Sequence, residues 1–141
     1  MAFIKKISVR FDDVDFARVV YFPKLFGYCH QVFEDFFAEA VGIPYSKMLQ
    51  ERKVGYPTVH TEADFGHPLR FGDVARISME TVKLSSKSIT NRYQLFLNDS
   101  TTLCAKVETI TVPIDMDTFK AQPVPEDVRI AFLNHLTGLT V

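Results

Sequence analysis

The chain has 141 residues, of which 47% are hydrophobic and 23% are charged, and its formal net charge is -1. This length and composition favour one domain with a sizeable core, and the small net charge gives no support to binding of nucleic acids or anionic membrane surfaces. No apolar run approaches the ~20 residues that span a bilayer. The N-terminus lacks a signal-peptide pattern, so we expect a cytoplasmic protein without an integral membrane segment.

The first part of the chain predicts a strand, an acidic loop and a long helix. Residues 5–11 alternate between apolar and polar side chains, as in a half-buried strand. Three carboxylates follow within residues 12–15. Pro23 suits the first turn of a helix, and apolar residues then recur at helical spacing to about residue 41. We expect Gly42 to end this helix, and a helix so widely apolar needs a curved sheet around it.

The second part predicts a helical turn at residues 45–52, several strands and a final helix. The strand candidates are residues 58–65, 74–84, 88–97 and 103–112. The last two are separated by turn residues and are expected to form a hairpin. The final helix follows Pro125 and is expected to stop at Gly138. The predicted class is therefore α+β, with an antiparallel sheet of about five strands wrapped around one long helix. We expect a dimer, because the other face of such a sheet also needs cover.

The acidic loop is the most informative segment for function. Asp12, Asp13 and Asp15 stand together between the predicted strand and helix. Unpaired carboxylates are costly to desolvate, and crowding shifts their pKa values, so acids beside a helix N-terminus are candidates for chemistry. The alternative is a polar loop with an N-capping Asp. The residues by themselves leave both interpretations open.

Several motifs, in order and spacing, resemble the hotdog-fold acyl-CoA thioesterases, and most closely the 4-hydroxybenzoyl-CoA thioesterases. The motifs are Asp13-x-Asp15, Val20-Tyr21-Phe22 at the helix start, Pro57-Thr58-Val59, the bend at residues 68–74, and Lys87-Ser88. The resemblance covers nearly the whole chain. It implies a single hotdog domain over residues 1–141 and a homodimer or a dimer of dimers (a homotetramer) with shared active sites. It also implies acyl-CoA hydrolysis that uses no metal and no cofactor beyond the coenzyme A of the substrate.

The resemblance assigns catalysis to Asp15, as nucleophile on the thioester carbonyl or as general base for water. Backbone N–H groups at the start of the helix then polarise the carbonyl, and Phe22 is the first choice, ahead of Tyr21 and Val20. The chemistry agrees, because thioester hydrolysis develops negative charge on the carbonyl oxygen, and a helix N-terminus offers unpaired donors and a positive dipole end. Asp13 is expected to have a structural role in the loop.

The residues expected to bind the substrate are His30, His60, Arg18, Lys87, Ser88 and Arg70. Arg18 stands where most relatives have Gly, so a positive φ there would cost about 1–2 kcal/mol. Either the loop is rearranged, or Arg18 brings positive charge to the thioester or the pantetheine arm. His30 replaces an acid that relatives often turn towards the acyl pocket, so aryl and medium-chain acyl groups both stay open. Lys87 and Ser88 match the segment that contacts the phosphates in relatives.

Other interpretations have less support. Glu34 lies on the helix that carries the catalytic Glu in a neighbouring branch of hotdog thioesterases. Cys29 and His30 are adjacent in a helix and do not face each other, so they are a poor nucleophile–base pair. His30, His60 and His67 match no metal-ligand spacing, and a hydratase motif is missing from the helix. The alternative function is a non-catalytic hotdog scaffold that binds acyl-CoA or a partner protein.

Overall fold

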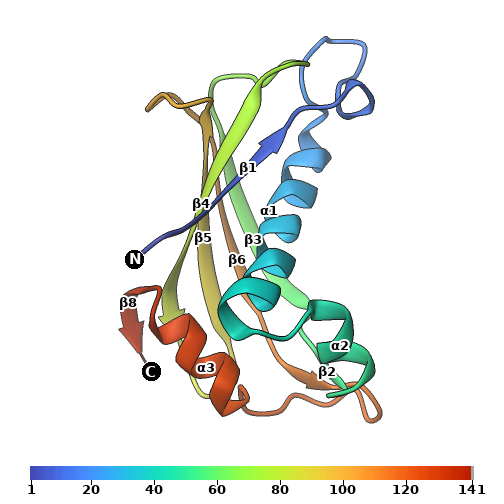
Figure 1. Cartoon of the computed structure of the whole chain (residues 1–141), viewed down its shortest axis with the longest axis vertical. Helices are drawn as coiled ribbons and strands as arrows, with labels where there is room; N and C mark the ends of the chain where they lie inside the picture. Colours follow the sequence, from blue (N-terminus) through green and yellow to red (C-terminus); the bar gives the residue numbers. More distant parts are fainter. Residues whose placement is uncertain (141) are drawn as a thin grey trace.

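The computed structural model describes the backbone of residues 1–140 and the side chains of residues 1–137. The elements are β1 (Phe3–Ser8), α1 (Phe22–Phe36), α2 (Tyr45–Gln50), β2 (Val54–Gly55), β3 (Thr58–Phe65), β4 (Val74–Leu84), β5 (Ile89–Leu97), β6 (Leu103–Thr111), β7 (Ile114–Asp115), α3 (Glu126–Leu133) and β8 (Leu136–Thr140) (Figure 1). The large sheet has the order β1-β4-β5-β6-β3, and β8 pairs with the free part of β4.

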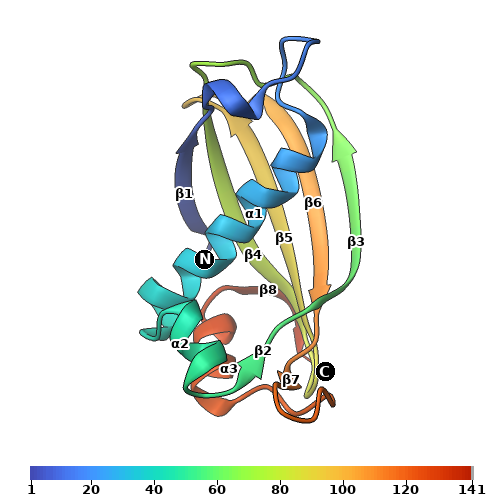
Figure 2. The ribbon, with the colours of Figure 1, turned by 90° about the vertical axis from the view of Figure 1, so that its right-hand side faces the viewer.

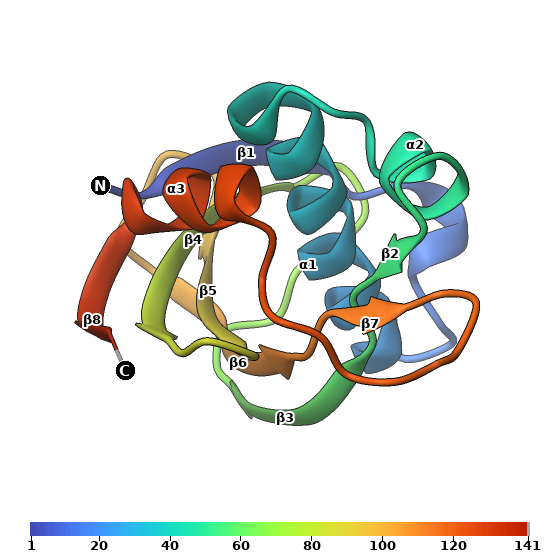
Figure 3. The same cartoon turned by 90° about the horizontal axis from the view of Figure 1, so that it is seen from below.

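The sheet curves around α1, which crosses its concave face (Figures 2 and 3). Strands β4, β5 and β6 form an antiparallel meander, with β1 antiparallel to β4 and β3 antiparallel to β6. Side chains of alternate residues on these strands pack against α1, as the period of a strand requires. This confirms the predicted α+β class. Among the described residues, no helix is long and apolar enough to cross a membrane.

Aromatic side chains join the C-terminal half of α1 to α3. Phe36 and Phe132 stack with ring centroids 4.5 Å apart, and both are fully buried. Phe33 and Phe37 lie 6.2 Å and 6.1 Å from the Phe132 ring. The phenylalanines of α1, and Phe37 in the π-helical turn that follows α1 (Phe37–Val41), therefore pack against α3 and fix its position.

The final helix is shorter than predicted. It ends at Leu133 rather than at Gly138, and the chain then forms β8, parallel to β4. The reason is that β1 pairs only with residues 74–79 of β4, so the rest of this long strand has an open edge. Strand β8 fills that edge, with Leu136 opposite Thr81. This long-range pairing overrides the local helix-stop signal at Gly138.

The convex face of the sheet is the one that we expected to be covered in a dimer. Its side chains are largely polar or charged, and Arg92 and Glu108 form an ion pair across β5 and β6 with a 3.6 Å separation. At the edge of the sheet, β3 is hydrogen-bonded to β6 and to no other strand among the described residues, and β1 is the edge strand on the opposite side. Seven of the eight residues of β3 are exposed, including Val59 and Phe65. Cover of the convex face in a dimer stays a prediction, and the open edge of β3 is a second surface that a second copy could pair with.

Candidate active site

The loop between β1 and α1 is closed at its base. Val14 and Val20 form an isolated antiparallel bridge. Inside it the Asp15 N–H donates to the Val19 carbonyl at 3.2 Å, and the Arg18 N–H donates to the Asp15 carbonyl at 2.9 Å. This backbone pairing fixes Asp15 beside the start of α1. The strand before the loop ends at Ser8, earlier than the predicted residue 11, because the chain turns into a 3₁₀ segment.

Asp13 ties this loop to the helix. Its Oδ2 accepts hydrogen bonds from the Arg10 N–H at 2.9 Å and from the Tyr28 hydroxyl at 2.6 Å. Its backbone carbonyl accepts from the Tyr21 N–H at 2.9 Å, and Lys24 Nζ lies 3.8 Å from Oδ1. Burial and the hydrogen bond to Asp13 raise the pKa of Tyr28, so its hydroxyl stays a donor. These contacts give Asp13 the structural role that the sequence predicted.

Asp15 differs from Asp13 in exposure and in pairing. Its side chain is exposed, and Oδ1 accepts the Ala17 N–H at 2.8 Å, which fixes the carboxylate orientation. Within the part of the chain that the structure describes, Oδ2 has no hydrogen-bond partner. Asp15 therefore presents one oriented and unoccupied carboxylate oxygen at the entrance to α1.

The N–H groups at the start of α1 are not equivalent. The Val20 N–H donates to the Leu69 carbonyl at 2.8 Å, and the Tyr21 N–H donates to the Asp13 carbonyl at 2.9 Å. Among the described residues, the Phe22 N–H has no partner. Of the three donors considered from the sequence, Phe22 is thus the one free to bind an oxygen atom at the positive end of the helix.

Arg18 adopts a left-handed backbone conformation, with φ of 70°. The position therefore does require the conformation for which Gly is usual, and the loop is not rearranged to avoid it. The Arg18 side chain is exposed beside the Asp15 loop, where it is available to an anionic ligand.

This conformation predicts opposite outcomes for two substitutions. Arg18→Gly relieves the strain of the left-handed region, whereas Arg18→Ala removes the same side chain and keeps the strain. We expect Arg18→Gly to have the higher free energy of unfolding, by about 1 kcal/mol, in urea titrations. Equal stability of the two variants would show that this backbone stores no strain. If the guanidinium binds substrate, KM rises in both.

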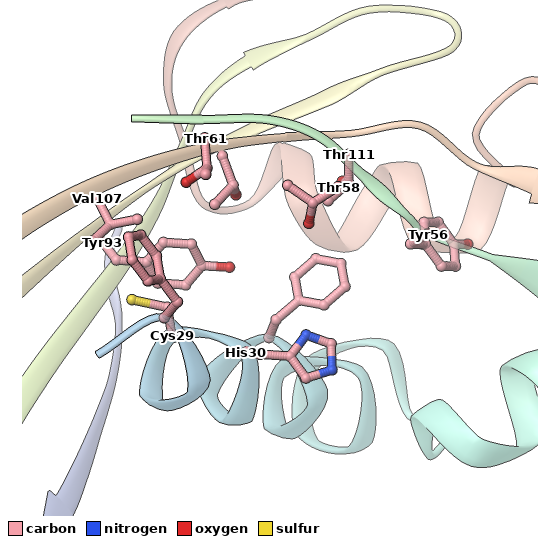
Figure 4. Close-up of a pocket in the computed structure, with 11 residues that line it drawn as sticks. Cys29, His30, Tyr56, Thr58, Thr61, Tyr93, Val107 and Thr111 are labelled. Carbon is pink, nitrogen blue, oxygen red and sulfur yellow. The ribbon is translucent and has the colours of Figure 1, made fainter. Parts of the chain in front are cut away.

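Two cavities flank α1 on the side that faces β3. The central cavity has a volume of about 230 Å³ and lies between the helix and the sheet (Figure 4). Its lining consists of Phe26, Cys29, His30, Phe33, Tyr56, Thr58, Thr61, Tyr93, Val107, Thr109 and Thr111. The loop cavity, of about 170 Å³, lies at the start of α1 and is lined in part by Phe22 and Phe65. The ring centroid of Phe65 lies 6.0 Å from that of Phe22 and 6.3 Å from that of Phe26. Because Phe22 lines the loop cavity and Phe26 lines the central cavity, Phe65 lies between the two cavities.

The structure separates the two predicted histidines. His30 lines the central cavity, and its Nε2 lies 2.8 Å from the Glu34 carboxylate one helical turn away. His60 is exposed on the convex face of β3, 3.4 Å from Glu62 on the same face. A bulge between Thr58 and His60 shifts the alternation of the strand. Thr58 and Thr61 therefore line the cavity, and the interpretation of His60 as a pocket residue is wrong for this chain.

The candidate phosphate-binding residues lie at opposite ends of strand β4. Arg70 lies in the connection before β4. The Asp73 carbonyl of this connection accepts a hydrogen bond from the Val9 N–H, and the Leu69 carbonyl accepts one from the Val20 N–H, so Arg70 is near the Asp15 loop. Lys87 and Ser88 lie in the turn after β4, and the Ser85 carbonyl in the same turn accepts a hydrogen bond from Arg129 of α3 at 2.9 Å. Strand β4 has 11 residues, which is about 35 Å of extended chain. Within one chain, Lys87 and Ser88 are thus not brought to Asp15.

The cysteines and histidines do not form an alternative centre. Cys29 and Cys104 are buried free cysteines. Burial raises the pKa of the Cys29 thiol to about 12, so it stays protonated near neutral pH and is no nucleophile. Among the residues with described side chains, no three His, Cys, Asp or Glu are grouped so that they could hold a metal ion.

Sequence reasoning missed the residues that line the sheet side of the central cavity. Tyr93 on β5 and Thr109 on β6 belong to this wall, and neither was singled out. The alternation of the strand could have identified Tyr93, because alternate residues share a strand face and Tyr93 lies on the same face as the buried Ile89 and Leu95. Tyr28 was also missed as the partner of Asp13. A tyrosine in the buried stripe of a helix needs a hydrogen-bond partner, and an acidic residue in the neighbouring loop is a natural one.

Comparison with known proteins identifies relatives over most of the chain. Residues 9–132 match the model of the thioesterase-like superfamily. A 1,4-dihydroxy-2-naphthoyl-CoA hydrolase from Rippkaea orientalis is 34% identical over 122 residues, which are 86% of this chain and 88% of the relative. The protein of the same name from Nostoc punctiforme is 31% identical over 128 residues, or 91% and 84% of the two chains.

Solved structures agree on the fold. A 1,4-dihydroxy-2-naphthoyl-CoA thioesterase from Synechocystis superposes with a TM-score of 0.87, covering 95% of this chain and 97% of that one, at 24% identity. A gentisyl-coenzyme A thioesterase superposes with a TM-score of 0.81, covering 92% and 98%, at 26% identity. The long helix in a curved antiparallel sheet is thus the hotdog fold.

Proposed function

The chain belongs to the thioesterase-like superfamily and is an acyl-CoA thioester hydrolase, and we propose that its substrate is an aryl-CoA, with 1,4-dihydroxy-2-naphthoyl-CoA as the first candidate. The observation that carries the proposal is that Asp15 Oδ2, in the loop before α1, and the Phe22 N–H, at the start of α1, both lack a hydrogen-bond partner among the described residues. The names of the two relatives supply the candidate acyl group.

In the proposed reaction the thioester carbonyl oxygen binds the Phe22 N–H. The helix dipole and this N–H stabilise the negative charge that develops on the oxygen. Asp15 attacks the carbonyl carbon or removes a proton from the attacking water, and the C–S bond then breaks to give the free acid and coenzyme A. Tyr21 contributes less, because its N–H already donates to Asp13. Neither a metal nor another cofactor is needed for these steps.

The acyl group extends along α1 into the central cavity. Phe22, Phe26 and His30 share one face of the helix, and the Cα atoms of Phe22 and His30 are about 12 Å apart along the axis. The His30 side chain leans back towards the helix start, so the remaining span suits one or two aromatic rings. An apolar cavity of about 150 Å³ holds benzene, and the 230 Å³ here leaves room for a larger arene. We propose that His30 contacts the distal part of the acyl group.

We propose that the active protein is a homodimer or a dimer of dimers. The exposed edge of β3 is free to pair with β3 of a second copy. Antiparallel pairing would bring the Lys87–Ser88 end of the partner towards the Asp15 end of this chain. Arg18 and Arg70 of one protomer and the Lys87–Ser88 turn of another would then meet the phosphates of coenzyme A. Light scattering would give a mass of two or four times 16.1 kDa.

The proposed activity is tested with a panel of thioesters. Release of free thiol is followed for 1,4-dihydroxy-2-naphthoyl-CoA, benzoyl-CoA and octanoyl-CoA. We expect kcat/KM for the naphthoyl ester to exceed that for octanoyl-CoA by at least about tenfold, because a flexible chain fills the cavity less well than rigid rings. Preference for octanoyl-CoA would contradict the aryl assignment. Tight binding of these esters without turnover would favour the non-catalytic scaffold.

A further inference from the structure

A polar side chain is buried without full pairing beneath the central cavity. Asn91 of β5 is completely buried, and its Oδ1 accepts a hydrogen bond from Thr81 Oγ1 at 2.9 Å. Its Nδ2 has no hydrogen-bond partner among the described residues. A buried amide N–H without a partner is destabilising. Its position beside the cavity residues Tyr93 and Thr109 therefore leaves an N–H donor available to a neighbouring oxygen in the functional state.

Tyr93 connects this amide to the cavity. It lies two residues from Asn91 on the same face of β5, and Thr109 is opposite Asn91 on β6. Burial raises the pKa of Tyr93, while the neighbouring Thr109 and Asn91 side chains oppose the rise. The phenol is therefore neutral and able to donate. Figure 4 shows the Tyr93 hydroxyl pointing into the central cavity.

The two walls of the cavity differ in chemistry. The helix side presents the rings of Phe26 and Phe33. The sheet side is lined by Val107 and by residues that carry hydroxyl groups, Thr58, Thr61, Tyr93, Thr109 and Thr111. The Thr61 and Thr111 hydroxyls donate to the backbone carbonyls of Glu108 and Ile89. An alkyl chain would give the Tyr93 hydroxyl no partner, whereas a planar ring can pack on the phenylalanines and direct an oxygen at the sheet. The cavity thus suits an oxygenated aromatic group.

We propose that Tyr93 and Thr109, supported by Asn91, form a subsite for an oxygen substituent on the aromatic ring of the acyl group. When the ring oxygen binds, Tyr93 and Thr109 donate to it, and the Tyr93 oxygen is then oriented to accept from Asn91 Nδ2, which has no partner among the described residues before binding. Asn91 thus acts as a positioning residue. The inference rests on the proposed function, because the group bound is part of the same aryl-CoA. It adds which side chains recognise the ring oxygen.

The test compares 1,4-dihydroxy-2-naphthoyl-CoA with 2-naphthoyl-CoA, which lacks the ring hydroxyls. We expect wild type to favour the hydroxylated ester in kcat/KM by at least about tenfold, and Tyr93→Phe or Thr109→Val to lower that ratio by about tenfold. Both variants should lose more rate with the hydroxylated ester than with 2-naphthoyl-CoA. Thr90→Val is the matched control, because it removes a hydroxyl from β5 on the face opposite Asn91.

A binding measurement separates failure of the subsite from failure of the proposed function. Calorimetry with the two free naphthoic acids needs no turnover. Suppose that neither ester is hydrolysed, but wild type binds the hydroxylated acid more tightly and Tyr93→Phe loses this difference in affinity. This result would support the subsite and contradict the proposed function. If the esters are hydrolysed with a ratio that neither Tyr93→Phe nor Thr109→Val changes, the subsite is overturned. Thermal unfolding shows whether Tyr93→Phe or Thr109→Val is misfolded. If one of them is, the substrate ratio of the other variant tests the subsite.

Discussion

Asp15→Asn is expected to lower kcat for aryl-CoA hydrolysis by about 10²–10⁴-fold, with little change in KM. The asparagine side-chain oxygen can still accept the Ala17 N–H, which Asp15 Oδ1 accepts at 2.8 Å. The loop therefore keeps its shape, and only the negative charge and the nucleophilic or basic oxygen are lost. Steady-state kinetics with thiol detection measure both constants.

Asp12→Asn is the matched control for this substitution. Asp12 is exposed in the same loop, three residues earlier, and takes part in none of the hydrogen bonds that the structure describes around Asp15. We expect Asp12→Asn to keep the wild-type rate. Full activity of Asp15→Asn would show that Asp15 is not the catalytic group. An equal loss in both variants would show that the charge of the whole loop, and not Asp15 alone, affects the rate.

The parts of the fold that depend on local signals could be predicted from the sequence. Strands β3 and β4 begin and end at the expected residues, because their alternation and the turn residues around them are local features. Strand β8 could not be predicted, since it forms only where a longer partner leaves an open edge. His60 was placed on the wrong face because a one-residue bulge reverses the alternation, and the sequence carries no clear mark of it.

In the candidate site, too, the features that depend on neighbouring residues could be predicted, and those that depend on distant parts of the chain could not. Asp15 and the helix start came from a motif confined to a few neighbouring residues. Choosing among the N–H donors required knowledge of their partners, and those partners include the Leu69 carbonyl, far along the chain. The sheet side of the central cavity, which includes Tyr93 and Thr109, depends on the register between β5 and β6, and this register is a property of the folded sheet. The matched family confirms the resemblance to acyl-CoA thioesterases, and the residue roles stay predictions.

Phe22→Pro isolates the contribution of a single backbone N–H. We expect kcat/KM to fall by about 10²–10³-fold relative to Phe22→Ala, the effect typical of losing one donor to a developing oxyanion. The replacement is compatible with the local backbone. Phe22 is the first residue of α1, where Pro is favoured. Tyr21 before it has φ of -61° and ψ of 123°, a conformation that a following proline accepts.

Phe22→Ala supplies the comparison, because it keeps the N–H and removes the aromatic contacts with Phe65 and Tyr21. Loss of those contacts affects both variants, so the difference between them reports the N–H alone. The N–H has no partner among the described residues, and its removal therefore breaks no hydrogen bond of the folded chain. Similar melting temperatures are expected for the two proteins. Equal kcat/KM values for the two would mean that the carbonyl oxygen is stabilised elsewhere, and that Asp15 works without this helix N-terminus.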